Sequence, residues 1–231
     1  MRAFILIALL PSVVALGEEP GVEQIVARAR AVVDQKLGPV TCKMSIETRI
    51  FDKKGQLEHT ETRDGQVKLD GDDSDFQLAR IVRDGKPLGA KELEGERARA
   101  DKARAEKKKH GDDDLDMSPL ASKNASGERF ELLRKEPLWG HDAWVLKVSA
   151  LRPQTSLASG TLWIDAGSFV ELKGELQPAK LPKHADWLKV QEQFRPARGG
   201  ALPSYLRITG AGHLLFFRKG FDTTMKWSGC G

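Results

Sequence analysis

The chain has 231 residues, a formal net charge of +4, and 30% charged residues of mixed sign. Interspersed charges are typical of solvated faces, and no basic stripe with interleaved aromatic residues indicates nucleic-acid binding. Past the N-terminus no segment is apolar and long enough to span a bilayer. We therefore expect neither a nucleic-acid-binding protein nor an integral membrane protein.

Residues 1–17 have the pattern of a secretory signal peptide. Arg2 precedes the apolar run 3–15, and the small residues Ala15 and Gly17 stand three and one positions before a cleavage site. The run is too short for a bilayer about 30 Å thick, which argues against the alternative of an uncleaved anchor. We predict cleavage and a periplasmic protein, with secretion as the alternative.

In the mature chain, 18–231, the first elements follow from hydrophobic periodicity. A helix is predicted over 22–37 and ends at Gly38-Pro39. The period then changes to two, which predicts a half-buried strand over 40–50. Its apolar residues share one face: Val40, Cys42, Met44, Ile46 and Ile50.

Two strands are predicted next, a polar one over 56–62 and another over 66–69, with Arg63-Asp64-Gly65 as the turn between them. Another strand is expected over 76–82. The segment 90–109 is rich in Ala, Glu, Lys and Arg and lacks β-branched residues. It is predicted as an exposed helix with weak docking, an insertion spanning 90–110.

The second half is a succession of short strands separated by turn residues. They are predicted over 129–133, 143–150, 160–165, 169–176, 187–194, 204–210, 213–219 and 223–227. In 169–176, the apolar residues Val170, Leu172 and Leu176 should face away from Glu171, Lys173 and Glu175. Gly210-Ala211-Gly212 is predicted as a turn.

These elements predict one mostly β (α+β) domain over 18–231. We expect an open antiparallel β-barrel or curved meander of about 10–11 strands, covered by the N-terminal helix and the inserted charged helix.

The chain has two cysteines, Cys42 and Cys230. In an oxidising compartment they are candidates for one disulfide that would close nearly the whole mature chain into a loop. The alternative is a buried Cys42 and a free thiol on the tail, and the sequence leaves both open.

Catalytic and metal-binding patterns are missing from the sequence. The five histidines show no metal-ligand spacing, and there is no GxSxG elbow and no Gly-rich phosphate loop. Asp112-Asp113-Asp114 with Asp116 lacks the alternating ligands of a calcium loop, so local charge pairs are the better interpretation. We expect no enzyme, no metal and no cofactor.

A curved sheet covered by helices can hold a hydrophobic ligand between its layers. The candidate lining residues are Met44, Ile46, Trp144, Leu146, Leu162, Ile164, Val170 and Leu172. The alternative is that these side chains fill a closed core.

Two motifs of the second half carry a family resemblance. The run from Pro137 to Val148 contains Gly140-His141-Asp142-Ala143-Trp144-Val145-Leu146, and Leu162-Trp163-Ile164-Asp165 follows. This pattern resembles the outer-membrane lipoprotein-sorting family, the LolA/LolB-like proteins that include the RseB/MucB stress regulators. The resemblance covers 129 to about 227 and is looser over 40–82; the charged 90–109 helix is an insertion relative to it.

The resemblance implies an open antiparallel barrel, lidded by helices, with a cavity for acyl chains. The leading hypothesis is a periplasmic lipid- or lipoprotein-binding, carrier-like protein whose partners are a hydrophobic ligand or lipoprotein acyl chains. The alternative is an envelope regulatory or protein-interaction domain with a structural, non-binding barrel and envelope proteins as partners.

Overall fold

A computed structural model describes residues 19–35, 38–71, 73–110, 117–197, 200–214 and 217–231. The predicted signal peptide and the aspartates of 112–116 lie outside these residues. No helix in the described ranges is both long and apolar enough to cross a membrane.

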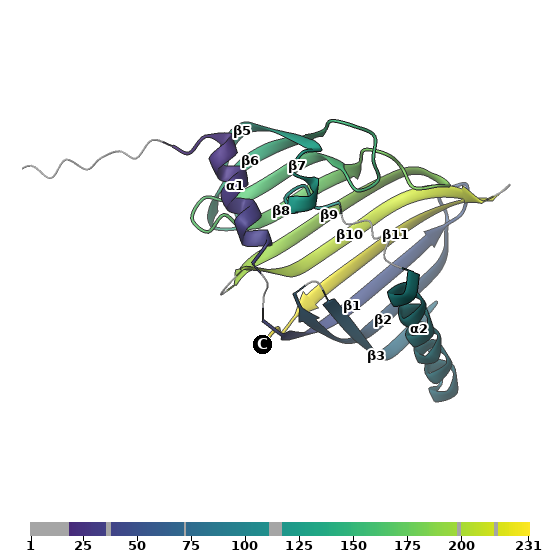
Figure 1. The fold of residues 1–231 in the computed structure, drawn as a ribbon. Helices are drawn as coiled ribbons and strands as arrows, with labels where there is room; N and C mark the ends of the chain where they lie inside the picture. The colour runs from purple at the N-terminus through teal and green to yellow at the C-terminus, as the bar shows by residue number, and fades with distance from the viewer. Residues whose placement is uncertain (1–18, 36–37, 72, 111–116, 198–199, 215–216) are drawn as a thin grey trace, which may run out of the picture.

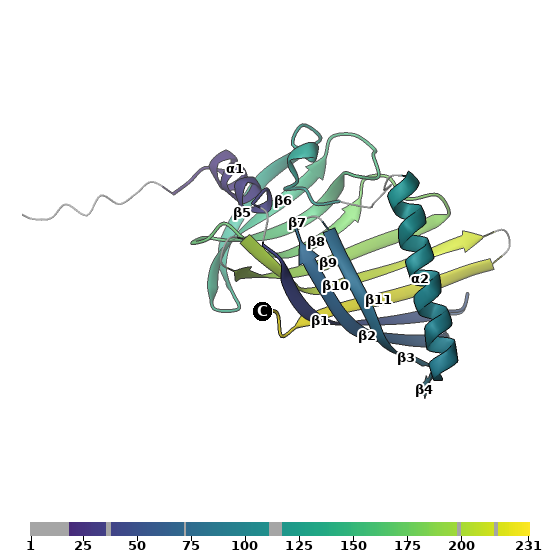
Figure 2. The same ribbon diagram turned by 60° about the horizontal axis from the view of Figure 1, so that its bottom comes forward.

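One antiparallel sheet of eleven strands forms the body of the protein, in the order β4-β3-β2-β1-β11-β10-β9-β8-β7-β6-β5. The sheet is open, and it curves towards the side on which the two helices lie (Figures 1 and 2). The prediction of a mostly β, open antiparallel fold with an N-terminal and an inserted helix is therefore confirmed. The strands are β1 (Val40–Phe51), β2 (Leu57–Asp70), β3 (Asp73–Arg83), β4 (Lys86–Pro87), β5 (Glu128–Leu138), β6 (His141–Ala150), β7 (Ala158–Asp165), β8 (Glu171–Pro178), β9 (Ala185–Ala197), β10 (Gly200–Leu214) and β11 (Phe217–Ser228).

The helix α1 (Val22–Val33) packs across one face of the sheet, which we call the inner face (Figure 1). Its Ile25, Val26 and Ala29 are buried in one cluster with apolar side chains of β6 to β9, and the helix contacts β5 and β10 directly. The helix ends earlier than the predicted 37, because the amide of Gln35 bonds to the carbonyl of Val32 in a tighter turn. Its apolar stripe thus covers one half of the inner face.

The helix α2 (Ala90–His110) lies beside β3 and is separated from α1 along the sheet (Figures 1 and 2). Its contacts are polar: Arg97 donates to the carbonyl of Leu78, and Arg104 pairs with Asp75 at 2.8 Å. Glu96 pairs with Arg83 at 3.4 Å. A helix without an apolar stripe is held here by charges, since it has little to bury.

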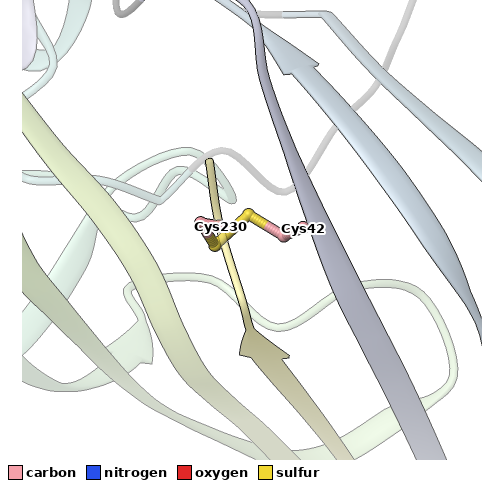
Figure 3. The surroundings of a disulfide bond; sticks show 2 residues. All are labelled: Cys42 and Cys230. Atoms are coloured by element: carbon pink, nitrogen blue, oxygen red, sulfur yellow. A yellow bond between two sulfur atoms is a disulfide. The ribbon is translucent and has the colours of Figure 1, made fainter.

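A disulfide joins Cys42 on β1 to Cys230, just after β11 (Figure 3). The two strands are neighbours in the sheet, with Met44 opposite Trp227. The amides of Thr41 and Gly231 also each bond to the other residue's carbonyl. The sheet itself therefore brings the two cysteines together.

Two glycine-containing segments that were predicted as turns lie inside continuous strands. Arg63-Asp64-Gly65 lies within β2, where the register against β3 shifts between Asp64 and Gly65. A Cβ at Gly65 would lie 2.2 Å from the carbonyl oxygen of Gln77 and 2.7 Å from Cε2 of Phe76, so the glycine allows a close approach of β3 and does not form a turn.

Gly210-Ala211-Gly212 lies inside β10, where its two glycines allow close approach of neighbouring segments. A Cβ at Gly210 would lie 2.7 Å from Cζ of Phe221, and one at Gly212 would lie 2.5 Å from the carbonyl oxygen of His184. The predicted strand 213–219 is therefore also wrong: β10 ends at Leu214 and β11 begins at Phe217.

Candidate ligand-binding cavity

A cavity of about 540 Å³ opens on the inner face of the sheet, beside the area that α1 covers. This volume falls within the range of about 300–1,000 Å³ that is usual for small-molecule sites. Its wall comes from β8, β9, β10 and β11 and from the segment before the short helix Ser122–Asn124. The large apolar side chains in this wall are Met117, Leu176, Leu188, Val190, Leu206, Ile208 and Phe221.

The cavity wall has polar groups at two places that are well separated along the chain. His184 and Glu192, eight residues apart along the chain at β9, both belong to its wall. Lys183 lies beside His184, and His184 has a left-handed backbone with φ of 70°. An apolar wall with polar groups at two places suits an amphiphilic molecule.

At the Glu192 end, two carboxyl groups converge above a glycine. A Cβ at Gly174 would lie 2.7 Å from Oε1 of Glu171 and 2.9 Å from Oε1 of Glu192. Glu171 is only 5% exposed, and its Oε1 has no hydrogen-bond partner among the described residues. Burial raises the pKa of Glu171 well above its usual range, and the charge of Glu192 raises it further.

A β-bulge turns Glu171 towards the inner face. The β7–β8 register shifts so that Trp163 pairs with Lys173 and Ile164 pairs with Glu171, which leaves Leu172 as the extra residue. Leu172 then packs with Trp163 on the outer face. The predicted alternation, with Glu171 on the solvated side, is therefore wrong, because one extra residue re-aims the side chains after it.

Four of the predicted lining residues lie together on the inner face, under α1: Trp144, Leu146, Leu162 and Ile164. Their exposed fractions are 5% or less, and they share one cluster with Ile25 of α1. They adjoin the cavity through Leu176 and Val190, which belong both to this cluster and to the cavity wall.

The other four predicted lining residues are dispersed. Met44 is in the wall of a separate hollow of about 820 Å³, next to Trp227. Ile46 packs beside the cluster of Cys42, Met44 and Val67. Val170 is buried in the connection before β8, and Leu172 faces outward.

The cavity-wall residues of β9 and β10 were missing from the predicted set, although the sequence carries a signal for them. Leu188 and Val190 alternate with charged or polar neighbours, as do Leu206 and Ile208. The alternation does not show which apolar side chains are covered by α1 and which line the cavity.

Three histidines that do not belong to the cavity wall each form a hydrogen bond with an aspartate. His59 meets Asp84, His141 meets Asp165 at 2.8 Å, and His213 meets Asp186 at 2.7 Å. Each is a two-residue pair, and the described part of the chain holds no group of three or more His, Cys, Asp or Glu placed for a metal.

The fold and the cavity define a class of protein: an open antiparallel sheet, covered by helices on its inner face, with an apolar hollow beside the first helix. Several solved structures are similar to the chain at low identity. A LolA superfamily protein from Nitrosomonas europaea has 13% identity over 90% of this chain and 91% of its own, with a TM-score of 0.36.

A domain named for outer membrane lipoprotein sorting, from Vibrio parahaemolyticus, has 14% identity over 89% of this chain and 90% of its own, with a TM-score of 0.40. The MucA/MucB complex of Pseudomonas aeruginosa gives 11% identity over 88% and 93%, with a TM-score of 0.27. No family model and no curated protein matches the sequence. At these identities and scores, no ligand, partner or residue role is taken from the matches.

Proposed function

We propose that the protein is an exported binding protein of the cell envelope that holds a lipid, a lipoprotein acyl group or another hydrophobic ligand on the inner face of its sheet. The observation that carries this proposal is the cavity of about 540 Å³ with its wall of large apolar side chains. An open apolar surface of this kind is costly to leave in water, and an apolar ligand would cover it.

Export is part of the proposal. The signal-peptide pattern of 1–17 and the Cys42–Cys230 disulfide both favour an oxidising compartment such as the periplasm.

Filling the cavity should abolish binding. Ile208 is half-buried in the cavity wall, so Ile208→Trp places an indole where the ligand would lie. We expect at least about a tenfold loss of affinity for the fluorescent apolar probe N-phenyl-1-naphthylamine, which corresponds to about 1.4 kcal/mol. Native mass spectrometry of the wild-type protein should also show a bound lipid that organic extraction removes.

The matched control is Lys189→Trp, an exposed position on the opposite face of β9. It adds the same indole outside the cavity and should leave the affinity unchanged. A wild-type protein that carries no extractable lipid and binds no apolar probe would refute the proposal.

The second candidate is an envelope regulatory or protein-interaction domain whose sheet is structural. It is favoured by the packing of α1, because Trp144, Leu146, Leu162 and Ile164 are sealed under that helix. A pull-down from envelope extract that yields a stoichiometric protein partner without lipid would support it over ligand binding.

A further inference from the structure

We propose that the carboxyl groups of Glu171 and Glu192 form a headgroup site at one end of the cavity, and that this site binds the ammonium group of an amine-bearing amphiphile. The inference rests on the proposed function, since it names the chemistry of the ligand's polar end. It also accounts for a buried carboxyl oxygen, Oε1 of Glu171, that has no hydrogen-bond partner among the described residues.

The geometry gathers acceptors in one place. Glu171 on β8 and Glu192 on β9 reach over Gly174, whose missing side chain leaves the space that their Oε1 atoms approach. Any Cβ at that position would lie within 3 Å of both oxygens. Glu192 belongs to the cavity wall, so the pair is in reach of a molecule lying in the cavity.

The surroundings select a donor that carries positive charge. Across the sheet, Gly174 is opposite Leu162 and Glu192 is opposite Leu206, so apolar side chains flank the carboxyls. Buried carboxyl oxygens need hydrogen-bond donors, and Glu171 Oε1 has none among the described residues. An ammonium group brings three donors and a compensating charge in one small headgroup.

The raised pKa of Glu171 agrees with this assignment. Its causes are burial first, then the charge of Glu192 and the hydrogen bond between the two carboxyl groups. A cation bound between the two carboxyl groups would offset the cost of burying their charge. A bound carboxylate or phosphate would add a further negative charge beside Glu192 in the same apolar place. Anionic headgroups are therefore expected at the Lys183 and His184 end instead.

A metal ion fits the pair less well. Ca²⁺ takes six to eight oxygen ligands, and two carboxyl groups in an apolar wall supply at most four. No third His, Cys, Asp or Glu of the described residues joins them in a metal-holding group.

The test is displacement of N-phenyl-1-naphthylamine by single-chain ligands of equal length, kept below their micelle-forming concentrations. Dodecylamine, which is an ammonium ion at neutral pH, is compared with dodecanol and dodecanoate. In the wild-type protein we expect dodecylamine to bind about tenfold tighter than dodecanol, the size of one charge-assisted contact. The variant Glu171→Gln/Glu192→Gln should bind the two ligands equally.

Glu175→Gln provides the matched control. Glu175 is on the same strand as Glu171, but it pairs with Lys173 at 2.6 Å on the outer face. This variant should keep the full preference for dodecylamine. The single variant Glu192→Gln tests the site with Glu171 intact and should lose most of the preference.

The outcomes separate the two proposals. If the probe and all three ligands fail to bind, the cavity is not a binding site and the proposed function is wrong. If they bind but dodecylamine has no advantage over dodecanol, or the Gln variants keep that advantage, only the headgroup site is overturned. Because the ligand comparison in the wild-type protein decides the matter alone, a variant that fails to fold does not rescue the proposal.

Discussion

Replacing both cysteines with serine should lower the free energy of unfolding by about 5 kcal/mol, on the chain-entropy model for a loop of this length. Cys42 and Cys230 are separated by 188 residues, so the disulfide removes many open conformations from the unfolded chain. In the folded protein the bridge joins neighbouring strands, where Met44 and Trp227 already pair. The loss should therefore act mainly through the unfolded state.

Denaturant unfolding of Cys42→Ser/Cys230→Ser, followed by tryptophan fluorescence, measures this effect. Wild-type protein with a reductant should unfold at the same denaturant concentration as the double variant, and the reductant should not affect the variant further. A difference below about 1 kcal/mol would show that the unfolded chain is already held together in another way.

The second large effect is a loss of stability as pH rises, caused by Glu128. This residue is 7% exposed, and burial raises its pKa from 4.5 to about 7, against the lowering effects of the Ala158 amide and of Arg30. A raised carboxyl pKa means that the folded state prefers the neutral form. Its contribution is complete below pH 4.5 and is lost as pH rises through about 7.

At about 1.4 kcal/mol per pKa unit, the cost of ionising Glu128 in the folded state approaches about 3 kcal/mol by pH 8. Urea unfolding at pH 5 and at pH 8 should show this loss in the wild-type protein and a smaller one in Glu128→Gln, whose side-chain oxygen still accepts from the Ala158 amide. Glu131→Gln is the control, because Glu131 is exposed on the same strand and pairs with Lys147. Equal pH dependence in the wild-type protein and Glu128→Gln would contradict the prediction.

The fold class was accessible from the sequence because alternation and helical periodicity are local signals. The two wrongly predicted turns, within β2 and β10, both contain glycines. Gly65 and Gly210 were interpreted as turn residues, yet each makes room for an aromatic ring on a neighbouring strand, Phe76 and Phe221. Such close approach depends on a partner far along the chain or across a turn, and the glycine itself does not reveal it.

The candidate site was harder to predict for a related reason. Glu171 was expected to share a face with Lys173 and Glu175, and the bulge at Leu172 places it on the face of Leu176 instead. A single unpaired residue changes which side chains share a face, and no local pattern marks its position. The predicted apolar residues also gave no sign of which would lie under α1, because that depends on where the helix docks.

The pairing of β1 with β11 has a consequence for the order of folding. The strands β1, β2 and β3 can form one local meander, and β5 to β11 can form another as each follows its neighbour. The seam between these two meanders runs from Lys43 opposite Ser228 to Phe51 opposite Gly220. It joins the first and the last strand of the chain, which are far apart in sequence. Such non-local pairing is slow to form. We expect the seam to close last, once β11 has been synthesised.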